Sequence, residues 1–434
     1  MRRTASNTWR ASSAVLIVWL TTYGRLCTGG LAADWPQWRG PARDGQSAER
    51  GLLGQWPQGG PPLVWKATGL GRGYSSVAVV GNRIYTAGLV AGGQAVLTAL
   101  DLHGHIVWQT PIAEREEPPN STPTVDGDRL YVITHRGQLV CCSTMHGQIL
   151  WQKNFRRDFD GQMMSGWGYS ESPLVDGDLL VCTPGGKQAL LAALDKKTGA
   201  VVWNCAVTGD LGPNGADGAA YSSIVLSHAA GVKQYVQLVG RGLVGVEAAT
   251  GKLLWHYNRI ANGTANIPTP VVRDDYVFGS CGYDSGAVLL RIQRNNDGSL
   301  RAQEVYYLPG RQLQNHHGGM ILLGDYLYLG HGHNNGFPLC IEWLTGKEMW
   351  RPGRGPGSGS AAIAYADGHL YFRYQDGTMA LIEATPTEYR LKGSFPLPSR
   401  LGESWPHPVI ANGHLYLRDQ DVLLCYDIRR PSGS

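Results

Sequence analysis

The stretch Ala193-Leu194-Asp195-Lys196-Lys197-Thr198-Gly199-Ala200-Val201-Val202-Trp203 contains a short apolar run, a polar turn and a second apolar run that ends in tryptophan. A glycine at such a turn suits the positive backbone angle of a tight connection between strands. A tryptophan one strand length later supplies a large apolar face. The stretch therefore predicts two antiparallel β-strands joined at Thr198-Gly199.

The same phrase returns along the chain, each time with a glycine four residues before a tryptophan. The pairs are Gly104 and Trp108, Gly147 and Trp151, Gly199 and Trp203, Gly251 and Trp255, and Gly346 and Trp350. The spacing is 43 residues from Trp108 to Trp151 and 52 from Trp151 to Trp203. This spacing is close to the period of four-stranded propeller blades.

A second phrase marks the other half of each unit: an apolar stretch, a tight polar turn and an apolar stretch that usually contains tyrosine. Its eight turns lie at residues 81–82, 126–128, 176–178, 227–233, 273–275, 324–325, 367–368 and 412–413. The last unit stops after Val422 to Asp427 and lacks an outer strand, whereas Pro62 to Lys66 looks like an outer strand without its beginning. We therefore predict an all-β, eight-bladed propeller of four-stranded antiparallel blades over residues 62–430, closed by this N-terminal strand.

The motif from Ala193 to Trp203 resembles the blade motif of the pyrroloquinoline-quinone (PQQ) type β-propellers, and the resemblance covers roughly residues 62–428. The opening from Asp34 to Pro41 resembles the leader of secreted bacterial propellers of this superfamily. The superfamily includes quinoprotein dehydrogenases and the propeller of the outer-membrane β-barrel assembly machinery. The resemblance thus implies a fold without selecting one function.

The first 33 residues have the order of a signal peptide: Arg2, Arg3 and Arg10, then an apolar run from Ala14 to Leu20, then small residues. We expect export to the periplasm or the extracellular space, with cleavage near Ala33. An uncleaved anchor is the alternative, although the apolar run is short for a bilayer span and no second span follows. Residues 34–61 form a segment rich in tryptophan, proline and glycine.

The composition argues against a nucleic-acid partner. The chain of 434 residues carries 38 basic and 34 acidic residues, and four of the arginines lie in the first 33 residues, which leaves 34 against 34. A neutral chain lacks the overall basic bias of a nucleic-acid binder.

The cysteines are too few and too scattered for a disulfide scaffold. We expect Cys182, Cys281, Cys340 and Cys425 to pack as small core residues. Adjacent Cys141 and Cys142 allow a vicinal disulfide, but neighbours on a strand point to opposite faces, which favours the reduced form.

In a blade, the loops after the second strands and the links between blades share one rim, here called the loop rim. The Asp-Gly and Thr-Gly turns occupy the opposite rim, here called the turn rim. Binding residues usually lie on loops of a rigid scaffold. The ligand-binding candidates on the loop rim are Trp167, Glu171, Arg241, His316, His317, His331, His333 and His407.

Two chemical interpretations of this rim remain open. His316, His331 and His333 are candidate ligands of zinc, copper or iron, or they line a ligand pocket. For PQQ, Trp167 or Trp405 would stack on the quinone, Glu171 or Asp217 would meet calcium, and Arg241 or Lys187 would pair with cofactor carboxylates.

We therefore predict an exported, non-catalytic propeller that acts as a binding or protein-interaction scaffold through its polar loop rim. Envelope proteins or a small molecule are the expected partners, with no transmembrane span and no cofactor. The alternative is a PQQ- and calcium-dependent quinoprotein alcohol or sugar dehydrogenase. The two differ at the rim, since an enzyme requires its carboxylates, arginine and tryptophan to converge on one pocket.

Overall fold

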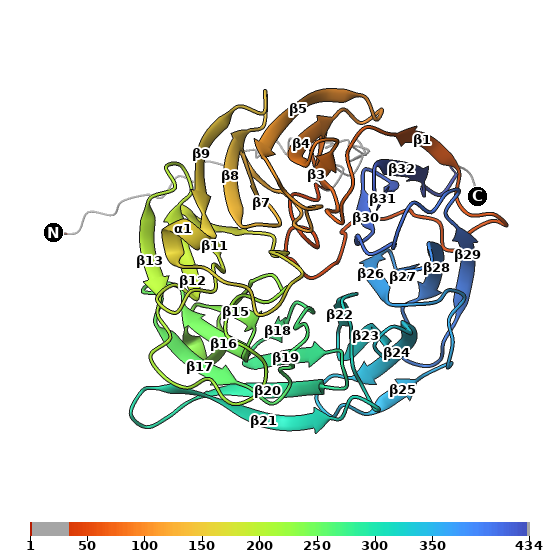
Figure 1. The fold of residues 1–434 in the computed structure, drawn as a ribbon. Helices are drawn as coiled ribbons and strands as arrows, with labels where there is room; N and C mark the ends of the chain where they lie inside the picture. The colour runs from red at the N-terminus through yellow and green to blue at the C-terminus, as the bar shows by residue number, and fades with distance from the viewer. Residues whose placement is uncertain (2–33, 432–434) are drawn as a thin grey trace. The chain divides into compact units, whose positions relative to one another are not determined.

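The computed structural model describes Met1 and residues 34–431. The predicted signal peptide lies outside the described residues. Within them, all strands belong to eight four-stranded antiparallel sheets arranged as the blades of a propeller ring (Figure 1). The eight-bladed all-β prediction is confirmed.

The first four blades follow each other along the chain. Blade 1 consists of β2 (Ala78–Val80), β3 (Arg83–Val90), β4 (Gln94–Leu100) and β5 (Ile106–Ala113), and blade 2 of β6 (Thr124–Asp126), β7 (Arg129–Ile133), β8 (Gln138–Ser143) and β9 (Ile149–Asn154). Blade 3 consists of β10 (Leu174–Asp176), β11 (Leu179–Cys182), β12 (Leu191–Asp195) and β13 (Val201–Cys205), and blade 4 of β14 (Val225–Ser227), β15 (Gln234–Val239), β16 (Gly242–Glu247) and β17 (Leu253–Tyr257).

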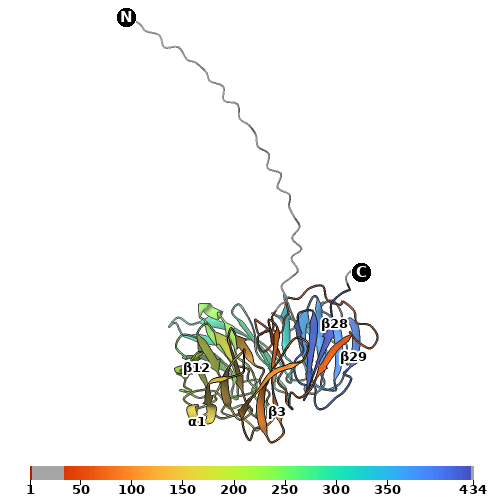
Figure 2. The same ribbon diagram turned by 90° about the horizontal axis from the view of Figure 1, so that it is seen from above.

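The remaining blades complete the ring, which Figure 2 shows from the side. Blade 5 consists of β18 (Val271–Arg273), β19 (Tyr276–Cys281), β20 (Gly286–Arg294) and β21 (Leu300–Leu308), and blade 6 of β22 (Met320–Leu323), β23 (Tyr326–His331), β24 (Phe337–Glu342) and β25 (Glu348–Trp350). Blade 7 consists of β26 (Ala361–Ala366), β27 (His369–Tyr374), β28 (Thr378–Glu383) and β29 (Leu391–Pro396), and blade 8 of β30 (Val409–Ala411), β31 (His414–Asp419), β32 (Val422–Asp427) and β1 (Leu63–Ala67). Two short helices, α1 (Phe155–Phe159) and η1 (Ala229–Gly231), lie between strands.

The ring closes through β1, which pairs antiparallel with β32 as the sequence predicts. Trp65 faces Cys425 and Lys66 faces Leu424 in the register of this pair. The first and last strands of the propeller thus pair in one blade, and this pairing closes the ring.

Four of the five repeated tryptophans bond to the next blade, whereas Trp255 Nε1 donates to Gln234 Oε1 of its own blade at 2.6 Å. The indole of Trp151 on β9 lies over Gly199 of blade 3, where an added Cβ would come within 2.7 Å of the ring, and its Nε1 donates to the Lys196 carbonyl at 3.2 Å. Trp203 on β13 lies in the same way over Gly251 and donates to the Ala248 carbonyl at 3.1 Å. At these two turns the glycine makes room for the tryptophan of the preceding blade, whereas Gly346 faces the ring of Tyr306.

Cysteines fill the same interfaces. Cys141 packs in the apolar cluster between blades 2 and 3, whereas Cys142 packs in the cluster between blades 1 and 2. Both thiols are free and buried, as are all seven cysteines of the described chain. The neighbouring side chains point to opposite faces of β8, as predicted.

The segment of residues 34–47 runs through the middle of the ring, which the sequence does not predict. Its backbone pairs with the inner strand of blade 1 between Trp35 and Val79, and Pro36 accepts a hydrogen bond from Val125 of blade 2. Farther along, Ser47 donates to Tyr365 of blade 7 through its backbone N–H. In Figure 1 this stretch is the reddest part of the ribbon. We call residues 34–47 the central segment.

No helix in the described residues is long and apolar enough to cross a membrane.

Candidate functional site

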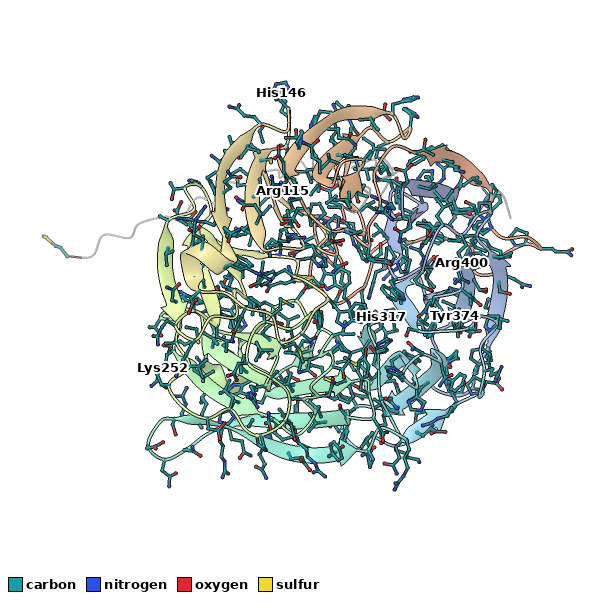
Figure 3. The ribbon with its side chains drawn as sticks, in the orientation of Figure 1. Arg115, His146, Lys252, His317, Tyr374 and Arg400 are labelled. Carbon is teal, nitrogen blue, oxygen red and sulfur yellow. The ribbon has the colours of Figure 1, made fainter. Side chains whose placement is uncertain are left out.

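A cavity of about 460 Å³ opens at the loop rim, where all eight blades and the central segment meet. His317, labelled in Figure 3, lies near the centre of the ring, far from His146 and Lys252 at its edge. The side chains that line the cavity are mainly aromatic or uncharged and polar. They include Trp38, Tyr74, Asn120, His135, Trp167, Ser170, Tyr221, Thr269, Tyr283, His316, His317, Asn334, Gln375, Trp405 and His407, with Arg39 and Glu117 as the charged residues.

The central segment forms one wall of this cavity through Trp38 and Arg39. The Trp38 ring lies 4.3 Å from the ring of His407, centroid to centroid, and its Nε1 donates to Thr269 Oγ1 at 3.3 Å. The Arg39 guanidinium is buried and donates to the carbonyls of Asp44 and Met320. Burial lowers the pKa of Arg39 to about 10, so this side chain stays charged at neutral pH.

Histidines form the side of the cavity that belongs to blades 6 and 8. The His316 ring lies 4.4 Å from the His333 ring, and its nitrogens contact Ser360 Oγ at 2.7 Å and Tyr283 Oη at 3.2 Å. Burial lowers the pKa of His316 to about 4 and that of His407 to about 3. These imidazoles are therefore neutral at pH 7, and each neutral ring offers one donor and one acceptor.

The predicted rim residues separate into two groups. Trp167, His316, His317 and His407 line the cavity, and His333 contacts it through the His316 ring. The other predicted residues, Glu171, Arg241 and His331, lie elsewhere.

Glu171 is buried behind the cavity wall. Its carboxylate accepts hydrogen bonds from Thr183 N at 2.6 Å, Thr183 Oγ1 at 2.8 Å and Gln237 Nε2 at 3.2 Å. Burial raises the pKa of Glu171 to about 8, although the two hydrogen bonds from Thr183 and nearby Arg43 oppose this shift. The perturbed carboxyl is thus explained by packing between blades 3 and 4.

Arg241 belongs to a second, smaller cavity of about 310 Å³ between blades 3 and 4, together with Lys187 and Asp217. Its Nε donates to Asp217 Oδ1 at 2.7 Å, so the two charges neutralise each other. His331 is buried and accepts a hydrogen bond from the Gln314 backbone N–H at 3.2 Å. Within residues 34–431, no three His, Cys, Asp or Glu side chains are grouped as ligands of a metal ion.

The cavity contains aromatic side chains that PQQ would need, but few ligands for the calcium ion that would accompany it. Trp167 and Trp405 both line the space, as the quinoprotein hypothesis requires. The proposed calcium ligands Glu171 and Asp217 do not reach it, and Arg241 and Lys187 lie in the second cavity. Glu117 is the one carboxylate among the lining residues, whereas calcium prefers several oxygen ligands with carboxylates among them.

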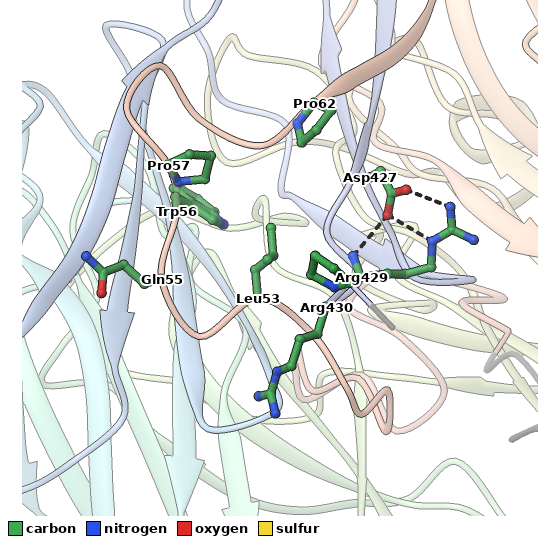
Figure 4. A pocket seen from close by; sticks show the side chains of 9 residues that line it. Leu53, Gln55, Trp56, Pro57, Pro62, Asp427, Arg429 and Arg430 are labelled. Atoms are coloured by element: carbon green, nitrogen blue, oxygen red, sulfur yellow. Dashed lines mark hydrogen bonds and ion pairs between the residues drawn. The ribbon is translucent and has the colours of Figure 1, made fainter. Parts of the chain in front are cut away.

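A third cavity, of about 860 Å³, lies on the turn rim beside the ring closure (Figure 4). Leu53, Trp56 and Pro62 line it together with Asp427 and Arg429. Asp427 and Arg429 bind each other, with Arg429 Nη2 2.6 Å from Asp427 Oδ2. The lining also includes Arg430, which donates to the Leu52 carbonyl at 3.4 Å.

Several lining residues were not among the predicted candidates. Trp38 and Arg39 belong to the opening motif from Asp34 to Pro41, which indicated a secreted propeller but not where the motif lies in the ring. Blade links and one loop supply Tyr74, Tyr221 and Gln375, and the sequence around these residues has no feature that marks a binding site. For Trp38 and Arg39, the available signal was an arginine beside tryptophan in a segment outside the repeats.

Comparison with known proteins agrees with this fold. A family model described as outer membrane protein assembly factor BamB matches residues 92–351. The chain therefore belongs to this family, whose members are PQQ-like β-propellers. No curated protein matches the sequence at a significant level.

Solved structures of two kinds resemble it. BamB from Moraxella catarrhalis is 14% identical with a TM-score of 0.58, and the match covers 86% of this chain and 99% of that one. A europium-containing methanol dehydrogenase is 13% identical with a TM-score of 0.64, and 89% of each chain is covered. The quinohemoprotein alcohol dehydrogenase from Comamonas testosteroni is 12% identical with a TM-score of 0.62, covering 92% of this chain and 81% of that one. At these identities the likeness concerns the fold alone.

Proposed function

We propose that this protein is an exported, non-catalytic propeller that binds a ligand or partner through the cavity on its loop rim. The observation that carries the proposal is the convergence of all eight blades and the central segment on one cavity. Ligand sites in proteins are concave, largely apolar and equipped with a few polar groups, and this cavity has that composition. A rigid ring that holds such a cavity at its centre suits recognition.

The positions of the candidate chemical groups support binding over catalysis. An alcohol dehydrogenase of this fold class needs a cation site and a base for the substrate proton beside the cofactor. Here the buried carboxyl of Glu171 is occupied by Thr183 and Gln237, and Arg241 is paired with Asp217 in another cavity. The groups that the enzyme hypothesis requires are dispersed.

The family description and the first 33 residues support export from the cytoplasm. The matching family is described as an outer membrane assembly factor, and the first 33 residues have the order of a signal peptide. We infer a place in the periplasm or outside the cell, where envelope proteins or small molecules would be the partners. The alternative, a PQQ- and calcium-dependent dehydrogenase, is favoured by Trp167 and Trp405 in the lining.

Calorimetric titration of the mature protein with PQQ and calcium tests the proposal, with a dye-linked dehydrogenase assay over alcohols and sugars alongside. The expected result is no binding at cofactor concentrations far above the micromolar range and no turnover. One-to-one binding with turnover would overturn the proposal. A Trp405→Ala variant should then lose that binding, because Trp405 would form part of the quinone site.

A further inference from the structure

Six residues of the loop-rim cavity hold buried polar atoms that have no hydrogen-bond partner in the protein. They are Arg39 Nε, His135 Nδ1, His317 Nε2, Gln375 Oε1, Trp405 Nε1 and His407 Nδ1. A buried polar group without a partner costs about 1–3 kcal/mol, so such groups are ordinarily satisfied by water or a ligand. Six such residues around one cavity give it a polar wall, which suits a ligand rich in hydrogen-bonding groups.

One of the six belongs to a buried cation. Arg39 is 3% exposed and forms no ion pair among the described residues, although the charge of Asp44 acts on it from a greater distance. The cavity's acidic residue, Glu117, is more than half exposed and lies 3.8 Å from Arg136. A buried charge is normally paired, which points to an anionic group on the ligand.

The aromatic rings are tilted around the space instead of forming a flat slot. Tyr74 and Trp405 meet at 34°, His317 and Trp405 at 62°, and Trp38 and His407 at 57°. Parallel walls would suit a planar ligand, whereas tilted rings that present both faces and N–H edges suit a three-dimensional ring bearing hydroxyl groups. Neutral imidazoles and amides, which both donate and accept, match hydroxyl groups for the same reason.

We propose that the loop-rim cavity binds an acidic saccharide, with the sugar rings against Trp405 and Trp38 and one carboxylate beside Arg39. This inference rests on the proposed binding function and names its ligand class. The volume of about 460 Å³ lies within the range of small-molecule sites.

The test is calorimetry with matched pairs of disaccharides. Hexuronic-acid disaccharides of several linkages are compared with neutral hexose disaccharides of the same linkages. The expected result is one-to-one binding of at least one acidic disaccharide, about tenfold tighter than its neutral counterpart, because a charge-assisted hydrogen bond adds about that factor.

Two glycine variants place the site. Gly319 lines the cavity with φ +75°, and a Cβ there would lie 2.3 Å from Arg39 Nη1 and 3.1 Å from His407 Cε1. Gly368 has a similar φ of +81° in a turn on the opposite rim, where a Cβ meets nothing within 4 Å. Gly319→Ala should therefore weaken saccharide binding more than tenfold, whereas Gly368→Ala carries the same kind of backbone strain and should bind as the wild type does.

Arg39→Gln isolates the charge. It should remove the preference for the acidic disaccharide while keeping weak binding of both members of the pair. Circular dichroism and the melting temperature establish that each variant is folded before its affinity is compared.

The outcomes separate the two proposals. Binding that Gly319→Ala does not weaken, or equal affinity for acidic and neutral members, would overturn the acidic-saccharide inference and leave the binding function standing. Absence of binding by every disaccharide at millimolar concentration would also overturn the inference. PQQ binding with turnover would overturn the proposed function itself.

Discussion

The rings of Trp38 and His407 lie 4.3 Å apart, centroid to centroid, although one belongs to the central segment and the other to the last blade link. Arg39, next to Trp38, is also one of the charges that lower the pKa of His407. The central segment therefore helps to build the loop-rim cavity. A propeller that lacked this segment would have a channel where this protein has a lined cavity.

Arg43 is expected to hold the central segment in place. It is buried and donates to the Ser172 carbonyl at 2.6 Å, the Pro173 carbonyl at 3.1 Å and Gln37 Oε1 at 3.0 Å. Arg43→Ala leaves these acceptors without their donor and should reduce the free energy of unfolding by about 3 kcal/mol. Urea denaturation measures the change.

The control for that variant is Arg50→Ala, because Arg50 is exposed and its side chain donates to the nearby carbonyls of Ala48 and Glu49. It should leave the stability within about 0.5 kcal/mol of the wild type. If Arg43→Ala and Arg50→Ala lost the same free energy of unfolding, the central segment would contribute little to stability.

Because Trp203 packs between two blades and Trp167 does not, replacing them should change the free energy of unfolding by different amounts. Trp203 is 9% exposed, covers Gly251 and donates to the Ala248 carbonyl, so Trp203→Leu should lower the free energy of unfolding by about 2–4 kcal/mol. Trp167 is 57% exposed at the mouth of the cavity, and Trp167→Leu should change the stability little. Similar midpoints for both variants in guanidinium would contradict the docking role.

Ring closure depends on β1. Removing residues 62–66 takes away most of the strand that pairs with β32 and should cost about 4 kcal/mol, at about 1 kcal/mol for each backbone hydrogen bond lost. Val64→Thr changes an exposed side chain of the same strand without removing its backbone, and should melt near the wild-type temperature. An unchanged melting temperature after the deletion would mean that blade 8 is stable without its outer strand.

Acid should destabilise the protein through its buried histidines. Burial, with Arg39 and Arg373 as further causes, lowers the pKa of His407 to about 3 in the folded state, whereas an unfolded histidine has a pKa near 6.5. The unfolded chain therefore takes up the proton first as the pH falls, so the stability is full above pH 6.5 and declines below it. At pH 5 the loss from His407 alone is about 2 kcal/mol.

Comparison of His407→Gln with the wild type between pH 7 and pH 5 measures this contribution. The variant's free energy of unfolding should fall by about 2 kcal/mol less over that range. His146→Gln, which changes an exposed residue, should follow the wild-type profile. Parallel profiles for His407→Gln and the wild type would contradict the assignment of a neutral, buried imidazole.

The blades could be predicted from the sequence because their signals are local and repeated. The four-residue spacing from Gly199 to Trp203 indicates a turn followed by a strand. Because the same spacing recurs along the chain, it indicates a ring of blades. Even the closure was predictable, since Pro62 to Lys66 matched the strand that the last unit lacked.

The site was predictable only in part. Trp167, His316, His317 and His407 were placed on the correct rim by the order of strands alone. The sequence could not separate them from Glu171, Arg241 and His331, because strand order assigns a residue to a rim but does not show whether its side chain turns to the axis or into the wall. The position of Arg39 depends on pairings such as Trp35 with Val79, which have no repeat to reveal them.

The most direct test of the central claim is a crystal structure of the protein soaked with an acidic disaccharide that calorimetry has identified. The account predicts ordered sugar in the loop-rim cavity, with a carboxylate beside Arg39 and hydroxyl groups at His317 and Trp405. Sugar bound elsewhere on the ring, with only water in the cavity, would contradict it.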